Sequence, residues 1–215
     1  MAIAYAPGLR EATGQQADWA SATVRVVTVF RSASGDLHTL QRGSGFVLDS
    51  WPDGVLTARH VVVRPPAIAE EAMGILLGVS GENGEFVVVN GVACGYPDDP
   101  DWDVAVVLFG APSAPHRVPL LTPRPADGSV SAGSVAGYLP SGTKPTVVPR
   151  SVRRAGRALT YEDGPALLGL SGGAVSVSGA ATGIQSFDVQ GRGHALILDF
   201  DVLNESRTAA EGKKP

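Results

Sequence analysis

Cysteine, aromatic residues and long hydrophobic runs are all scarce in this 215-residue sequence. Cys94 is the single cysteine, so the chain cannot form an internal disulfide, and metal sites built from several cysteines are excluded. Folds that rely on packing alone are typical of intracellular proteins, so we expect a cytoplasmic location. No window approaches the ~18 consecutive apolar residues of a membrane-spanning helix. The N-terminal segment also lacks the basic start and continuous apolar run of a secretory signal.

Charge of either sign is limited as well. The chain has 17 Lys and Arg against 21 Asp and Glu, which gives a net charge of -4. Such a balance offers no broad basic field that could hold phosphate groups. We therefore expect no nucleic-acid partner, and the lack of a long apolar run leads us to expect no membrane partner either.

Glycine and proline, in contrast, are abundant, with 27 and 16 residues and no collagen-like three-residue period. They separate short valine-rich runs, a pattern typical of an all-β sandwich or barrel. Helical periodicity is almost absent, and only Ala67–Met73 suggests a short helix. Strands are expected near Val24–Phe30, Leu37–Gln41, Gly45–Leu48, Val55–Thr57, Ile75–Val79, Glu85–Ala93, Val104–Leu108, Val130–Tyr138, Pro145–Arg154, Ala174–Val177, Ala181–Phe187 and Ala195–Phe200.

The proline-rich stretch Gly110–Pro125 divides these strands into two groups. Proline cannot donate to a central ladder, so this stretch is interpreted as a connector between two β units. The sequence predicts an N-terminal extension over residues 1–20, a first β unit over 21–112, a connector over 113–125 and a second β unit over 126–203. A hairpin turn is expected at Ser80–Gly84. The polar residues 204–215 are expected to form a frayed tail or a linker to another module.

One serine has a local sequence that favours an exposed, nucleophilic hydroxyl. Ser171 belongs to the segment GLSGG, whose small residues allow a sharp turn that leaves the hydroxyl uncovered. A hydroxyl becomes a nucleophile only when a base takes its proton and a carboxylate orients that base. His60, at the end of VLTARH, is the candidate base, and Asp103, at the start of the apolar run DVAVVLF, is the candidate carboxylate.

Other histidines and the cysteine predict no further chemistry. His38, His116 and His194 are far apart in the sequence and lack paired cysteines or acids at short spacing, so no zinc site is expected. Cys94 follows a β-rich run and is expected to be a small buried side chain. Because a serine, a histidine and an aspartate suffice for acyl transfer, we expect no cofactor.

Four regions of the sequence resemble the chymotrypsin and trypsin superfamily. They are GSGFVLDS with LTARHVV around His60, DWDVAVV around Asp103, GLSGGAV around Ser171, and ATGIQSF followed by GHALILDFDVLN. Within it, they resemble the disulfide-free bacterial trypsin-like domains related to the high-temperature-requirement proteases. These four regions keep the family's order and cover the chain from about Val24 to Leu203. The resemblance implies two six-stranded Greek-key β-barrels with an active cleft between them.

The resemblance also implies a serine endopeptidase acting on polypeptides through a covalent acyl-enzyme. Ser171 would attack the scissile carbonyl, His60 would move the proton and Asp103 would orient the imidazole. The N–H groups of Gly169 and Ser171 would form the oxyanion hole.

Substrate contacts are implied at the strand residues Gln185, Ser186, Phe187 and Asp188. Pro165 stands where trypsin carries the acid that selects Lys or Arg. Apolar or small side chains are therefore expected first at the cleavage site, and basic ones second, with Asp163 or Asp188 as a carboxylate from another wall.

Leu170 replaces the aspartate that captures a freshly cut N-terminus in digestive members of the superfamily, so activation by that route is not expected. The leucine either packs in the core or marks a loop that orders only with a partner, such as an activating or sensing module.

Two other functions compete with the peptidase. GLSGG also fits the nucleophile elbow of α/β-hydrolases, but that fold places its aspartate and histidine after the serine on alternating strands and helices. The second alternative is a catalytically silent binding module that keeps the protease fold.

Overall fold

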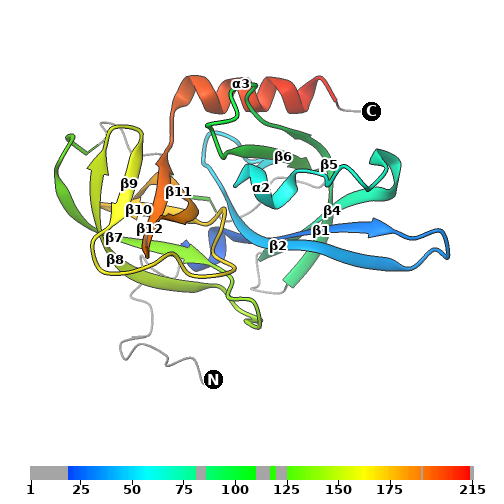
Figure 1. Cartoon of the computed structure of the whole chain (residues 1–215), viewed down its shortest axis with the longest axis horizontal. Helices are drawn as coiled ribbons and strands as arrows, with labels where there is room; N and C mark the ends of the chain where they lie inside the picture. Colours follow the sequence, from blue (N-terminus) through cyan, green and yellow to red (C-terminus); the bar gives the residue numbers. More distant parts are fainter. Residues whose placement is uncertain (1–18, 81–85, 110–116, 120–124, 190, 214–215) are drawn as a thin grey trace.

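The computed structural model describes residues 19–80, 86–109, 117–119, 125–189 and 191–213. Two closed antiparallel barrels of six strands each make up the molecule, with strand orders β1-β2-β3-β6-β5-β4 and β10-β11-β12-β9-β8-β7 (Figure 1). This confirms the two-barrel fold class expected from the sequence. The first barrel contains β1 (Thr23–Arg31), β2 (Leu37–Val47), β3 (Gly54–Thr57), β4 (Met73–Ser80), β5 (Phe86–Gly95) and β6 (Ala105–Phe109). The second contains β7 (Val130–Gly137), β8 (Thr146–Ala155), β9 (Ala158–Tyr161), β10 (Ala174–Val177), β11 (Ala180–Val189) and β12 (Arg192–Ile197).

The helical segments of the described chain are few. α2 (Arg59–Val62) is a single turn after β3, and η1 (Glu70–Ala72) is a 3-10 turn before β4. The helix expected over Ala67–Met73 is therefore wrong, because Met73 already belongs to β4 and only η1 is helical. Proline at positions 65 and 66 and an exposed acidic pair give this stretch no apolar face to bury.

Two further differences concern the strands. The separate runs Leu37–Gln41 and Gly45–Leu48 form one continuous strand, β2, which keeps its pairing through a bulge opposite Thr28 and Val29. β9 was not expected at all, although it pairs with both β8 and β12 and closes the second barrel. Of the hairpin turn expected at Ser80–Gly84, only Ser80 lies within the described residues.

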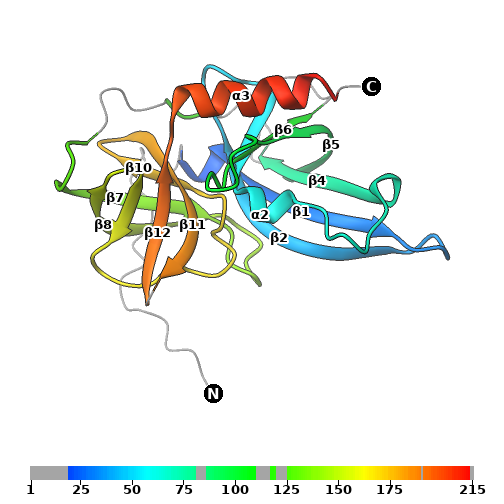
Figure 2. The same ribbon diagram turned by 45° about the horizontal axis from the view of Figure 1, so that its top comes forward.

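α3 (Phe200–Glu211) corrects the expectation of a frayed tail after residue 203. Asp199 caps the helix by accepting hydrogen bonds from the N–H groups of Asp201 and Val202. The helix leaves the second barrel and crosses above β5 and β6 of the first, as both ribbon views show (Figures 1 and 2). Its contact with β5 is so close that a Cβ on Gly95 would lie 2.1 Å from the carbonyl oxygen of Ser206. Among the described helices, none is long and apolar enough to cross a membrane.

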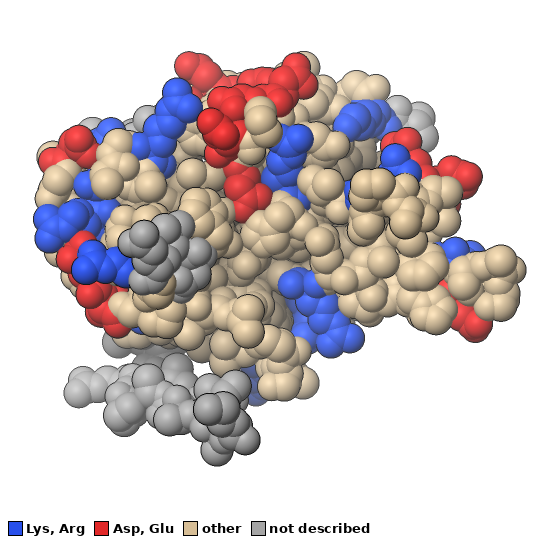
Figure 3. Space-filling model, in the orientation of Figure 1, with Lys and Arg blue, Asp and Glu red and all other residues tan. Residues whose placement is uncertain are grey.

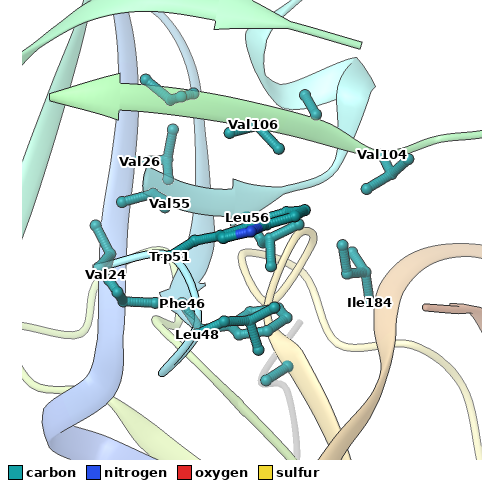
Figure 4. Close-up of a cluster of buried hydrophobic side chains, with 14 of the residues drawn as sticks. Val24, Val26, Phe46, Leu48, Trp51, Val55, Leu56, Val104, Val106 and Ile184 are labelled. Carbon is teal, nitrogen blue, oxygen red and sulfur yellow. The ribbon is translucent and has the colours of Figure 1, made fainter. Parts of the chain in front are cut away.

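The larger of the two hydrophobic clusters extends across the seam between the barrels. The larger buried cluster fills the first barrel and includes Leu56, Trp51 and Val104, together with Ile184 from β11 of the second barrel. Figure 4 shows the side chain of Ile184 lying beside this first-barrel cluster. A smaller cluster belongs to the second barrel alone. Burial across the seam therefore fixes the relative position of the barrels by the same apolar packing that stabilises each of them.

The connector touches both barrels where it is described. Val118 forms a parallel bridge with Leu48 of the first barrel, and the carbonyl of Pro119 accepts a hydrogen bond from the N–H of Ala181 in the second. Most of the proline-rich stretch, residues 110–116 and 120–124, lies outside the described residues. Residues 117–119 therefore lie at the seam, in contact with both barrels.

Candidate active site

His60 lies at the start of a short helix that the first barrel holds in place. α2 begins two residues after β3, and the hydroxyl of Thr28 on β1 donates a 2.7 Å hydrogen bond to the carbonyl of Val61. The N–H of His60 donates to Oδ1 of Asp103 at 2.8 Å, and Nδ1 of its imidazole lies 2.7 Å from Oδ2 of the same carboxylate. An ionised carboxylate can only accept, so Nδ1 carries the proton and Nε2 of the neutral ring keeps a free lone pair.

Asp103 precedes β6 and is held by residues from both barrels. Its neighbours Trp102 and Val104 are buried, and its own side chain is 19% exposed. The hydroxyl of Ser186, on β11, donates to Oδ2. Partial burial by itself would raise the pKa of Asp103, but the hydrogen bonds from His60 and Ser186 outweigh burial and lower the pKa below its ordinary value. The carboxylate therefore stays charged at neutral pH and can stabilise a protonated imidazole.

Ser171 lies in the turn between β9 and β10, whose backbone needs glycine. Gly169 and Gly172 on either side of it both have a φ of +84°, a region that side chains rarely adopt. The N–H of Gly172 donates to the carbonyl of Gln185 at 2.8 Å, and the N–H of Gln185 donates to the carbonyl of Gly173 at 2.9 Å. The turn is thus attached to β11, which also carries Ser186.

Two donors of this turn stay unused. Within residues 169–173, the N–H groups of Leu170, Gly172 and Gly173 all have carbonyl acceptors. For the N–H groups of Gly169 and Ser171, in contrast, the described residues offer no acceptor. Paired free N–H groups beside a serine are the donors that an oxyanion requires.

The serine turn and the histidine helix meet at the seam between the barrels. A Cβ on Gly43 would lie 2.7 Å from the side chain of Val61, the residue after His60, and 2.9 Å from the carbonyl oxygen of Ser171. A Cβ on Gly172 would lie 2.8 Å from the N atom of Ala58. The glycines at these two positions let the backbone segments that carry Ser171 and His60 approach closely.

The segments expected to bind substrate border this turn. Gln185 is buried, accepts a hydrogen bond from the Tyr161 hydroxyl at 3.3 Å and donates to the carbonyl of Leu167 at 2.9 Å. Pro165 is exposed, and its carbonyl accepts a hydrogen bond from Arg150. Phe187 is half-exposed and stacks on His194 with ring centroids 5.6 Å apart.

Other predicted positions are resolved to different degrees. Asp188 belongs to β11, but its side chain lies outside the described residues. Leu170 is completely buried in the second-barrel core, which favours the packing interpretation of this residue. The carboxylate of Asp163 accepts from the N–H of Ser151 at 3.1 Å and lies 3.9 Å from the guanidinium of Arg150, so it is already engaged.

A shallow, open pocket of about 670 Å³ lies beside the imidazole. Its lining combines His60 and Asp103 with Arg59, Val63, Pro100, Asp101 and Phe187. The pocket is wide open to solvent and places Phe187 of β11 on the same surface as His60 and Asp103.

The remaining singled-out groups have structural partners or lie outside the described chain. His38 stacks on Phe30, whereas His116 is not among the described residues. Burial raises the pKa of the Cys94 thiol to about 12, although Lys213 acts in the opposite direction. No group of three or more His, Cys, Asp or Glu side chains in the described chain could hold a metal ion.

On the face drawn in Figure 3, acidic side chains gather near the top, over α3, and basic ones form separate patches.

Sequence reasoning missed two contributions to this site. Ser186 was expected only to bind substrate, but its hydroxyl contacts Asp103. Ser44 was not singled out, although it bonds to both Gly169 and Ser171. The one available signal for Ser44 was its place in GSG next to the strand that precedes His60, and that signal does not identify a partner 125 residues away in the sequence.

Comparison with known proteins supports the fold. No family model and no curated protein matches the sequence. Among solved structures, the chain is similar to Deg5, with a TM-score of 0.68 and 20% identity over 88% of this chain and 89% of that one. It is also similar to the serine protease of a human pathogenic astrovirus, with a TM-score of 0.54 and 18% identity over 85% and 92% of the two chains. The chain therefore has the chymotrypsin-like double-barrel fold of serine proteases, which confirms the expected resemblance at the level of the fold.

Proposed function

We propose that the chain is a serine endopeptidase in which Ser171, His60 and Asp103 form the catalytic triad. The observation that carries the proposal is the unused pair of N–H groups at Gly169 and Ser171, in a turn whose other donors are all bonded. Gly169 and Ser171 are only partly buried, so a substrate oxygen can reach this turn, and two free N–H groups beside a serine match the donors of an oxyanion hole. The turn is packed against the segment that carries the His60 and Asp103 pair.

The proposed reaction follows from these positions. Nε2 of His60 takes the proton of the Ser171 hydroxyl as the oxygen attacks a peptide carbonyl, and the N–H groups of Gly169 and Ser171 bind the oxyanion. The imidazolium is stabilised by Asp103 and then gives its proton to the leaving amine. Water attacks the acyl-enzyme by the same route in reverse, which restores Ser171.

For the substrate, we propose apolar or small side chains at the residue before the scissile bond. Pro165 offers no charge there, and the Asp163 carboxylate is bound by Arg150 and Ser151. Leu168 and Phe187, at 81% and 47% exposure, are apolar side chains on the segments that flank Gln185 and are available for such contacts. An extended polypeptide would pair with β11 near Phe187.

A fluorophosphonate probe tests the nucleophile directly. We expect stoichiometric labelling of the wild-type protein and complete loss of labelling in Ser171→Ala. Ser141→Ala is the matched control, because Ser141 also precedes a glycine in a turn and is more exposed than Ser171. Digestion of a peptide library by wild type and Ser171→Ala then gives the cleavage preference. Absence of both labelling and cleavage in the wild type would contradict the proposal and favour a binding module with this fold.

A further inference from the structure

Ser44 connects the first barrel to the serine turn through its N–H and its hydroxyl. It is fully buried on β2. Its N–H donates to the carbonyl of Ser171 at 2.8 Å, and its hydroxyl donates to the carbonyl of Gly169 at 2.8 Å. The same hydroxyl accepts from the N–H of Tyr138 at 2.7 Å, and the Ser44 carbonyl accepts from the Thr57 hydroxyl at 2.7 Å. One residue of the first barrel therefore binds both residues whose N–H groups are unused.

These hydrogen bonds restrain the flexible backbone at Gly169. Gly169 has no side chain and a positive φ, so local sterics leave its peptide groups free to rotate. The Gly169–Leu170 peptide is instead held at both ends, at the carbonyl by Ser44 and at the N–H by the carbonyl of Leu167 at 3.2 Å. Ser44 also fixes the carbonyl of Ser171. With the carbonyls held, the orientation of the two free N–H groups is restricted.

We propose that Ser44 is a positioning residue that keeps the N–H groups of Gly169 and Ser171 in the orientation that binds an oxyanion. The inference rests on the proposed peptidase function for its catalytic consequence. In this proposal the hydroxyl does not touch the substrate, and it acts on the turn through the carbonyl of Gly169, while its bond from the N–H of Tyr138 holds the hydroxyl in place. Its loss removes stabilisation of the transition state and leaves ground-state binding along β11 intact.

Ser44→Ala tests this role, with Ser176→Ala as the matched control. Ser176 is also buried on a strand, and its hydroxyl bonds to Ser134, but the structure shows no bond from it to residues 169–173. We expect Ser44→Ala to lower kcat by about 10- to 100-fold, less than the full loss of an oxyanion donor, with KM changed by less than about twofold. The affinity for a peptide aldehyde, whose oxygen occupies the oxyanion position, falls by the same factor as kcat. Ser176→Ala leaves both quantities near the wild-type values.

Hydrogen exchange gives a second measurement that does not depend on catalysis. We expect faster exchange over residues 167–173 in Ser44→Ala than in the wild type or Ser176→Ala, while thermal unfolding shows that all three proteins are folded. If the wild type neither cleaves peptides nor reacts with the fluorophosphonate, the proposed function fails, and the exchange data still decide whether Ser44 holds the turn. Unchanged exchange, or a rise in KM at constant kcat, overturns the inference on Ser44.

Discussion

The two barrels contribute to the candidate site in different chemical forms. The first barrel supplies side chains, and the His60 and Asp103 pair is fixed by hydrogen bonds at 2.7 and 2.8 Å between them. The second barrel supplies a hydroxyl and backbone N–H groups, which a glycine turn presents. Each barrel also holds part of the other's contribution, because Ser186 binds Asp103 and Ser44 binds Gly169. Neither barrel therefore holds a complete site alone.

The largest effect is expected when the group that either barrel contributes to the site is removed. We expect His60→Ala and Ser171→Ala each to lower kcat by about 10⁶-fold, since the groups act as one unit. The double variant should be little slower than either single variant. Steady-state hydrolysis of one peptide substrate by all three proteins measures this, and multiplicative losses would show that the barrels act independently.

A smaller loss is expected when only the orientation of the imidazole is disturbed. Asp103→Asn offers an amide where the carboxylate now accepts from Nδ1, so the wrong tautomer of His60 is favoured. We expect kcat to fall by about 10⁴-fold. The same variant should keep its affinity for a non-cleaved product peptide, measured by calorimetry. Near-normal kcat in this variant would remove Asp103 from the triad.

Stability should respond to changes at the first barrel that spare the serine turn. Gly95→Ala places a methyl group 2.1 Å from the carbonyl oxygen of Ser206, so α3 must move away from β5. We expect the free energy of unfolding to fall by about 2 kcal/mol or more. Gly74→Ala is the control, since its nearest contact would be an ordinary 3.8 Å. Chemical denaturation compares the two variants, and equal losses would mean that α3 does not pack as described.

The smallest effect of the series is expected from acid, which reduces the contribution of Asp103 to the stability of the first barrel. The folded-state pKa of Asp103 lies below its ordinary value, so its contribution to stability is present above about pH 4 and is lost as pH falls through the folded-state pKa. We expect the stability advantage of wild type over Asp103→Asn to shrink between about pH 5 and pH 2. Denaturation curves across that range measure the difference. A difference that does not depend on pH would argue against the hydrogen bonds from His60 and Ser186 as the source of the shift.

Sequence patterns predicted the barrels better than the contacts between them. Valine-rich runs such as Val104–Leu108 match observed strands closely because burial on both faces leaves a continuous apolar signal. β9 (ALTY) was missed because it lacks the valine residues by which the equally short β10 (AVSV) was identified. α3 was missed because its apolar stripe is narrow, although Asp199 is a recognisable helix cap.

For the site, local motifs marked His60, Asp103 and Ser171, and the His60 and Asp103 contact is present in the structure. The additional partners could not be predicted in the same way. The bonds of Ser44 and Ser186 join residues 125 and 83 positions apart, and such long-range pairs leave no local signature in one sequence. Their identification requires the closed barrels that bring β2 and β11 to the seam.

The position of α3 has a consequence for how the protein is made. This helix packs on β5 and β6 of the first barrel, yet its residues follow the whole second barrel in the chain. During synthesis from the N-terminus, the apolar face that α3 covers stays open until residues 200–211 have left the ribosome. The first barrel therefore reaches its final packing only after the second barrel has been synthesised.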